Sequence, residues 1–282
     1  MKLTEHQLNH FNTFGFVVFR QLLSPEEMKR FSQEFDLGLD SWLPAGTKHD
    51  GSARHYATLM DSITPFTASL LDDPRFADAA EQLMGTDSIG IVADGNYYVG
   101  DTAWHPDGHR LLEDGTPVDY SGVKFTIYLE PQDGTNGALR VIPGSHKDPY
   151  YSQLYSRLIE YPEGKRERVT PEDAFAMSGA DLPAYVFDSQ PGDVLAFRTS
   201  LWHAAFGGGD HRRMATYVYY DDPQTPEAEA EIQRIMTTNH SLYASQGRRM
   251  YTDFYRSNPD PRHQRWVRRL DELGVLETPG VA

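Results

Sequence analysis

Apolar positions in the first 35 residues follow the periods of two short helices with a strand between them. Apolar residues in segment 3–14 recur at the spacing of one helix face, and segment 15–19 (Gly-Phe-Val-Val-Phe) has the character of a strand. Ser24 then precedes Pro25, and Glu27 follows the serine by three positions, which is the capping-box pattern of a helix N-terminus. We therefore predict a second helix from residue 25 to about residue 35.

Short β-rich runs begin near residue 90 and are separated by Gly, Pro, Asp and Asn. In segment 123–129, Lys124, Thr126 and Tyr128 alternate with apolar residues, as expected of a strand with two different faces. Many short strands with turn residues between them indicate an antiparallel sandwich or barrel. The predicted strands are residues 89–92, 96–99, 123–129, 139–142, 185–187, 194–197 and 214–220.

The remaining segments predict helices and loops around this β region. Segments 223–246 and 260–273 have the pattern of C-terminal helices, and polar residues 150–180 indicate a loop insertion with some helix. Loops 40–60 and 150–180 could cover a pocket or could be ordinary surface. Because no repeat or linker interrupts the chain, we predict one domain over residues 1–282. Residues 1–90 would pack on the barrel, 91–222 would form its core, and 223–282 would add the C-terminal helices.

Composition narrows the classes of function. The chain has 282 residues, of which 39% are hydrophobic, so a sizeable core is possible. A net charge of −15 disfavours nucleic-acid binding, and no apolar stretch has membrane-spanning length. The N-terminus lacks the apolar core of a signal peptide, so we expect a cytoplasmic protein by default. With no cysteine, any metal must be held by His, Asp, Glu or water.

Two histidines and an aspartate stand out as candidate metal ligands. His105 and Asp107 follow a strand-like run, and residues two apart on extended backbone point to the same side. His203 follows the predicted strand 194–197. Two imidazoles and one carboxylate can hold one face of a ferrous ion and leave its other positions open, as in non-haem iron oxygenases. The triplet starting at His146 has the same His-x-Asp pattern, but it follows a Pro-Gly-Ser turn, and we interpret it as structural.

An arginine pair follows the second histidine. Residues 207–209 are three glycines that permit a tight reversal, after which the chain can return antiparallel with an arginine near His203. Such an arginine can anchor a dicarboxylate through its two-pronged donor geometry. Alternation lets only one of Arg212 and Arg213 face the barrel interior. We favour Arg213, because Ala215 would leave room for a ligand where Met214 would not.

At these residues the chain resembles the phytanoyl-CoA dioxygenase family of iron(II)- and 2-oxoglutarate-dependent oxygenases. The similar segments are 129–131, 136–146 (Asn-Gly-Ala-Leu-Arg-Val-Ile-Pro-Gly-Ser-His), 190–194 and 14–18, and the resemblance extends over residues 4–220. It implies a mainly β fold with flanking helices, a double-stranded β-helix of the cupin-like jelly-roll type. The histidine-to-arginine spacing is slightly shorter than is common in the family.

The resemblance also implies roles for particular residues. His105, Asp107 and His203 would be the iron ligands, and Arg213, or alternatively Arg212, would bind the distal carboxylate of 2-oxoglutarate. Thr126 would line the co-substrate pocket, with Lys124 as a weaker candidate on the same strand face. Since Asp107 is present, the chain is not of the halogenase type, which lacks this carboxylate.

The function implied is hydroxylation of an unactivated C–H bond of a small-molecule metabolite. The reaction would use Fe(II) as its metal cofactor, consume 2-oxoglutarate and O2, and release succinate and CO2. Three alternatives stay open: another oxidative outcome at the same iron, namely desaturation, epimerisation or cyclisation; a non-catalytic jelly roll that binds a metal or ligand; and, less well supported, a zinc hydrolase. The substrate and the oligomeric state are left open, and neither a nucleic-acid nor a membrane partner is expected.

Overall fold

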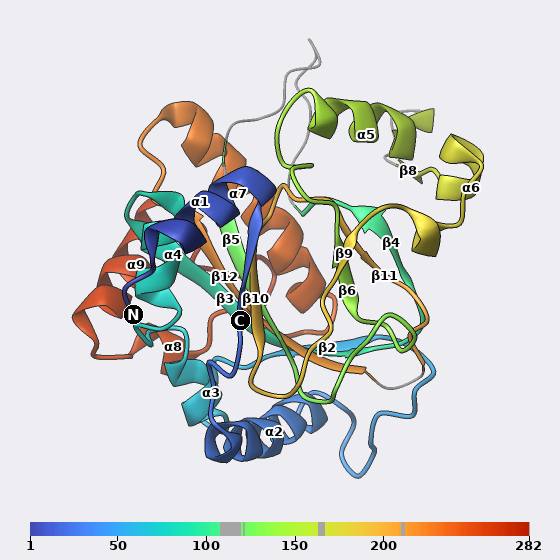
Figure 1. The fold of residues 1–282 in the computed structure, drawn as a ribbon. Helices are drawn as coiled ribbons and strands as arrows, with labels where there is room; N and C mark the ends of the chain where they lie inside the picture. The colour runs from blue at the N-terminus through green and yellow to red at the C-terminus, as the bar shows by residue number, and fades with distance from the viewer. Residues whose placement is uncertain (108–119, 121, 163–166, 210–211, 282) are drawn as a thin grey trace.

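Two antiparallel β-sheets form the centre of the protein, as shown by a computed structural model that describes residues 1–107, 120, 122–162, 167–209 and 212–281 (Figure 1). The larger sheet has six strands and the smaller sheet has four. In spatial order, the larger sheet contains β1 (Phe16–Phe19), β10 (Val194–Arg198), β5 (Gly122–Tyr128), β12 (Arg212–Asp221), β3 (Ser88–Tyr98) and β2 (His55–Thr58). The smaller contains β4 (Thr102–His105), β11 (His203–Ala205), β6 (Leu139–Val141) and β9 (Tyr185–Val186).

Helices precede, interrupt and follow the strands. The N-terminal helices are α1 (Glu5–Phe14), α2 (Pro25–Asp40), α3 (Pro65–Ser69) and α4 (Ala77–Met84). The insertion between β6 and β9 contains α5 (Tyr150–Leu158), the ribbon of β7 (Ile159–Glu160) and β8 (Glu167–Arg168), α6 (Pro171–Phe175) and a 3₁₀ turn, Gly179–Asp181. The C-terminal helices are α7 (Pro226–Ala244), α8 (Asp253–Arg256) and α9 (Pro261–Glu272).

The facing sides of the two sheets enclose a small apolar core. Tyr128 and Met214 of the larger sheet pack there with Leu139 and Val141 of the smaller sheet. Strand alternation explains this selection, because the neighbours of these residues along each strand point to the other side. The interior of the barrel is therefore built from every second residue of its strands.

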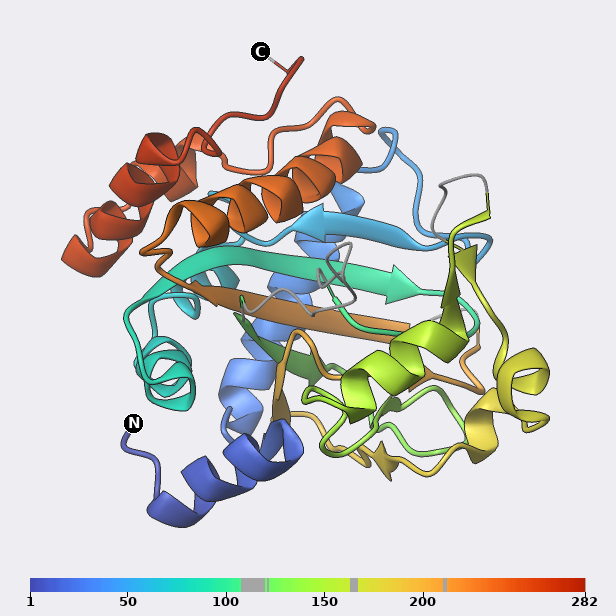
Figure 2. The same ribbon diagram turned by 90° about the horizontal axis from the view of Figure 1, so that it is seen from above.

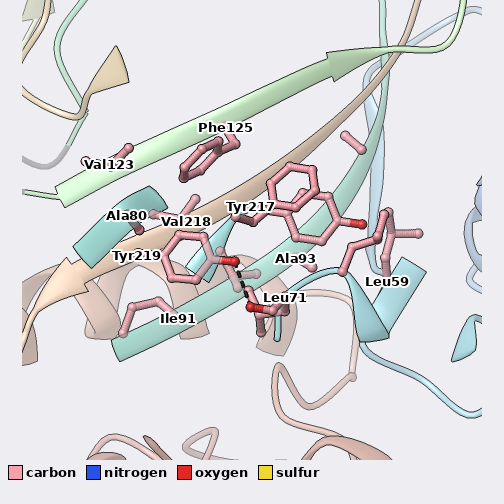
Figure 3. Close-up of a cluster of buried hydrophobic side chains, with 14 of the residues drawn as sticks. Leu59, Leu71, Ala80, Ile91, Ala93, Val123, Phe125, Tyr217, Val218 and Tyr219 are labelled. Carbon is pink, nitrogen blue, oxygen red and sulfur yellow. Dashed lines mark hydrogen bonds between the residues drawn. The ribbon is translucent and has the colours of Figure 1, made fainter. Parts of the chain in front are cut away.

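The outer side of the larger sheet packs against the N- and C-terminal helices and forms the main core. Figure 3 shows Phe125, Tyr217 and Tyr219 in this cluster, with the Tyr219 hydroxyl donating to the Leu71 carbonyl at 2.7 Å. Such bonds satisfy the polar ends of otherwise buried aromatic side chains. The sheet is thus held between helices on one side and the smaller sheet on the other.

Two further helices cover the outer side of the smaller sheet and the edge strand β2 of the larger sheet. Helix α5 packs Tyr151 and Tyr155 against Trp202, on the outer side of the smaller sheet. Helix α7, orange in Figure 2, lies beside β2, where the Tyr56 hydroxyl donates to the Leu242 carbonyl at 2.7 Å. Within the described segments, no helix combines the length and the apolar character needed to cross a membrane.

The predicted helices and strands are largely confirmed, with one clear correction. Segments 89–92 and 96–99 were predicted as separate strands, but β3 runs unbroken through Gly95. A Cβ on Gly95 would lie 2.6 Å from a Leu39 methyl carbon and 2.8 Å from the Phe35 ring. The glycine therefore serves the close approach of α2 to the sheet and does not form a turn. Helix α2 also extends beyond the predicted end at residue 35, to Asp40.

We propose that the three predicted segments form one domain. The main core contains side chains from all of them, including Phe35 of α2, Tyr217 of β12 and Trp266 of α9. Trp266 lies against Gly90, whose Cβ would come within 2.6 Å of the indole, and its Nε1 donates to the Ser88 carbonyl at 2.7 Å. The C-terminal helices are therefore packed directly on the strand that leads toward β4.

Trp266→Ala is expected to lower the free energy of unfolding by about 3–5 kcal/mol, because it removes a fully buried indole and leaves a cavity. Urea unfolding followed by both fluorescence and circular dichroism measures this change. The control is Arg268→Ala in the same helix, since Arg268 is exposed. Separate transitions in the wild type, or an effect of Trp266→Ala no larger than that of the control, would contradict a single domain.

Candidate metal centre

The pairing of β4 with β11 places the two candidate histidines side by side. His203 lies directly opposite His105 in the ladder, and their ring centroids are 4.3 Å apart. In each ring Nδ1 faces a carbonyl oxygen two residues earlier, Ala103 at 2.7 Å and Leu201 at 2.8 Å. Because a carbonyl only accepts, Nδ1 carries the proton, and the Nε2 lone pair of each ring is available to a metal.

Asp107 completes the group from the bend that follows β4. Its backbone N–H donates to the Thr199 carbonyl at 2.8 Å, which ties the bend to the larger sheet. The carboxylate oxygens lie 3.8 Å from Nε2 of His105 and 3.5 Å from Nε2 of His203. Adjacent ligands about 2.1 Å from one ion are about 3 Å apart, so these side chains need only small movements to bind a common ion.

These three residues form a compact group of metal-ligand type. One ligand atom from each lies within 4.8 Å of the others, and the described part of the chain offers no second group of three or more such residues. His146 and Asp148 do not belong to it. His146 instead packs against Gly15, where a Cβ would lie 2.5 Å from the imidazole. The structure thus agrees with the structural interpretation of His146.

Burial and a nearby lysine set the protonation of the group. Burial lowers the pKa of both His105 and His203, which favours neutral imidazoles. Burial raises the pKa of Asp107, but Lys124 and the two histidines outweigh it and bring this pKa below its usual range. Lys124 Nζ donates to Asp107 Oδ2 at 2.5 Å. Neutral imidazoles and an ionised carboxylate are the states that bind a divalent ion.

The preference for an inward-facing Arg213 is corrected by the structure. Arg213 lies on the outer side of β12, where it pairs with Asp36 at 2.9 Å and Glu130 at 2.5 Å. Ala215, on the same side, packs in the core beneath the helices. The small side chain of Ala215 therefore leaves room for the helices. The prediction that it leaves room for a ligand was wrong.

Arg212 is the arginine that points into the barrel, on the same side as Met214. It is 3% exposed, lies over the Tyr98 ring at 5.2 Å, and donates from Nη1 to the Gly137 carbonyl at 2.8 Å. A Cβ on Gly137 would lie 2.0 Å from Nη1, so only glycine leaves space for the guanidinium. This contact joins residues 75 positions apart in the chain, so no local sequence pattern indicated Arg212 in preference to Arg213.

Lys124 and Thr126 both face the barrel interior, as the alternation predicted. Lys124 is beside Asp107. Tyr128, two positions beyond Thr126, is close to Arg212. Burial raises the pKa of Tyr128, and the nearby Arg212 lowers this pKa by a smaller amount. Thr126 therefore lies between the metal group and Arg212. Its hydroxyl is buried and makes no hydrogen bond within the described residues.

A cavity of about 410 Å³ opens beside Asp107 and Lys124. Its walls include side chains from α7, such as Arg234 and Asn239, whose place at the site no sequence pattern indicated. The cavity also reaches Asp94 of β3, which was not among the predicted site residues. The other lining residues are Val92, Tyr155, Tyr161, Thr216, Val218, Tyr220, Ile235 and Thr238.

Known structures share this fold. HygX from Streptomyces hygroscopicus, solved with nickel and 2-oxoglutarate, is similar with a TM-score of 0.59 and 18% identity, over 80% of this chain and 94% of that one. EctD from S. alaskensis, solved with 2-oxoglutarate and 5-hydroxyectoine, has a TM-score of 0.54 and 22% identity, over 78% of this chain and 76% of that one. These likenesses confirm the predicted mainly β jelly roll with flanking helices.

Sequence comparisons identify relatives among dioxygenases. An ectoine dioxygenase from Nocardia farcinica is 29% identical over 71% of this chain and 71% of its own length. Another, from Bordetella bronchiseptica, is 26% identical over 51% of this chain. The match covers 50% of the Bordetella protein, so the chain spans about half the length of several curated relatives.

The family assignment rests on a profile match over more than half of the chain. The profile described as phytanoyl-CoA dioxygenase (PhyH) matches residues 11–215, which include helices α2 to α4, nearly all of the barrel strands and all three candidate ligands. The match thus confirms the resemblance drawn from the sequence motifs. The chain belongs to the phytanoyl-CoA dioxygenase (PhyH) family.

Proposed function

We propose that the chain is an Fe(II)- and 2-oxoglutarate-dependent dioxygenase that hydroxylates an unactivated C–H bond of a small-molecule metabolite. The observation that carries this proposal is the convergence of His105, Asp107 and His203 beside a cavity. O2 would supply one oxygen atom to the product and one to succinate, and the carboxylate next to the keto group would leave as CO2. Relatives named ectoine dioxygenase support this reaction class.

The donor set fits a ferrous ion. His105 and His203 would bind through Nε2 and Asp107 through a carboxylate oxygen, which leaves positions for a co-substrate and oxygen. The Nδ1–H of each ring remains bonded to a carbonyl and would hold its orientation. When bound, the iron would supply the redox chemistry that activates oxygen.

Arg212 fits the distal carboxylate of 2-oxoglutarate. A buried guanidinium is normally paired with an anion, yet Arg212 forms no ion pair with any described residue, and its Nε is buried without a hydrogen bond. The Thr126 hydroxyl, also buried without a partner in the described chain, lies between Arg212 and the metal group and can donate to the same carboxylate. Together these groups would bind the distal carboxylate of 2-oxoglutarate.

The remaining task of the chain is to hold the substrate and exclude water. The cavity adjoins the metal ligands and has room for a small molecule. C–H hydroxylation by this route needs no protein acid or base, so positioning is the main requirement. A small-molecule partner is consistent with the relatives, while the cytoplasmic location remains a prediction.

The same fold also occurs in proteins with other oxidative outcomes. SnoN is an epimerase and SnoK a carbocyclase, with TM-scores of 0.53 and 0.54 to this chain. Their identities of 18% and 20% carry the fold alone. We therefore propose hydroxylation first, because the sequence relatives are named dioxygenases.

Asp107→Ala and His203→Ala are each expected to reduce 2-oxoglutarate turnover by more than about 100-fold, since loss of a direct ligand exceeds the effect of losing a supporting group. Succinate release measures turnover, and anaerobic Fe(II) titration measures metal binding. The control is His6→Ala, which removes an exposed imidazole. Near-normal turnover in either ligand variant would exclude this assignment of the metal site.

Arg212→Ala is expected to weaken 2-oxoglutarate binding by about 10- to 100-fold, because charge-assisted hydrogen bonds to the distal carboxylate are lost. Calorimetry on the metal-loaded protein measures the dissociation constant. Arg213→Ala is the matched control, and it is expected to change binding less than about threefold, because Arg213 pairs with Asp36 and Glu130. A larger effect of Arg213→Ala would reverse the assignment.

A further inference from the structure

Asp94 is a carboxylate on the inner side of β3 that faces the cavity beside the metal group. It lies opposite Thr216 in the β3–β12 ladder, and the Thr216 hydroxyl donates to its Oδ1. Among the described residues, Oδ2 makes no hydrogen bond and no cation forms an ion pair with Asp94. A half-buried carboxylate that lines a cavity can accept a hydrogen bond from a ligand through its second oxygen.

The two cations that line the cavity are already engaged. Lys124 donates to Asp107 at 2.5 Å. Arg234 is bound by the buried Glu231, with Nε at 3.0 Å and Nη2 at 2.5 Å from the two carboxylate oxygens. Near the metal group, the described walls therefore present two carboxylates, Asp94 and Asp107, and one ammonium, which donates to Asp107 and acts on Asp94 only at longer range. Among the described residues, Asp94 thus keeps one carboxylate oxygen available to a ligand.

Aromatic and neutral polar groups form the rest of the wall near α7. Tyr155, Tyr161 and Tyr220 contribute ring surfaces, and the Tyr155 and Tyr161 hydroxyls hydrogen-bond to each other. Thr238 and Asn239 add groups that bind polar substituents without supplying charge. Tyrosine rings attract cations as well as apolar surfaces, so this wall suits a compact organic cation.

We propose that Asp94 anchors a positively charged nitrogen of the substrate, and that the enzyme therefore acts on amine-bearing small molecules. This inference rests on the proposed function, because it takes the cavity as the substrate site. Asp94 is a specificity-determining residue in this view. It holds the cation by a charge-assisted hydrogen bond from Oδ2, while Thr216 keeps the carboxylate oriented through Oδ1.

The test compares two probes of similar shape, cyclohexylamine, which is protonated at neutral pH, and cyclohexanol. Their dissociation constants are measured by ligand-observed NMR titration on the full chain. Wild type is expected to bind the cation at least about tenfold more tightly, the effect of one charged hydrogen bond. Asp94→Asn should reduce this preference to within about twofold, whereas Asp94→Glu, which keeps the charge, should retain most of it.

Asp87→Asn is the matched control, because Asp87 is exposed in the turn before β3 and outside the cavity. It should leave the preference unchanged, and urea unfolding checks that each variant is folded. Equal binding of the two probes by wild type, or a preference that survives Asp94→Asn, would overturn the proposal. The binding measurement needs neither iron nor turnover. A negative result would therefore overturn the role of Asp94 without affecting the test of the dioxygenase reaction by Asp107→Ala and His203→Ala.

Discussion

The antiparallel pairing of β4 with β11 is the interaction on which the candidate site depends. These strands are separated by almost a hundred residues, yet their register puts His105 and His203 directly opposite each other. Asp107 lies in the bend after β4, and its backbone N–H donates to the carbonyl of Thr199, which follows β10 of the larger sheet. Both strands are short, so their geometry depends on β6 beside β11 and on Trp104 and Trp202, which pack under α5. The apolar core therefore sets the metal geometry.

The charged side chains inside the barrel differ in whether they have a partner of opposite charge. Asp107 has Lys124 as its partner, whereas Arg212 and Asp94 lack ion-pair partners in the described chain. Isolated buried charges cost free energy, so proteins retain them mainly where a ligand supplies the opposite charge. We therefore propose a dicarboxylate beside Arg212 and a cation beside the half-buried Asp94.

Much of the fold followed from local patterns, and the exceptions have physical causes. The capping box at Ser24, the alternation in β5 and the amphipathic period of α9 all depend on neighbouring residues, and each predicted element is present. The predicted break between residues 92 and 96 was wrong, because Gly95 lies within β3 and admits α2, which is distant in sequence. Conversely, the wall that α7 contributes to the cavity has no local signature, since it depends on where the helix packs.

Residue chemistry and strand periodicity are properties of short segments, so the candidate metal ligands, the family and the β-rich core could be predicted from the chain alone. Which arginine faces the barrel interior could not be predicted in this way. Alternation requires Arg212 and Arg213 to point oppositely, but which side is inside depends on what packs against β12. Here the helices cover the side of Ala215 and Arg213, and Gly137 opens space for Arg212 on the other. Those contacts join residues far apart in the chain.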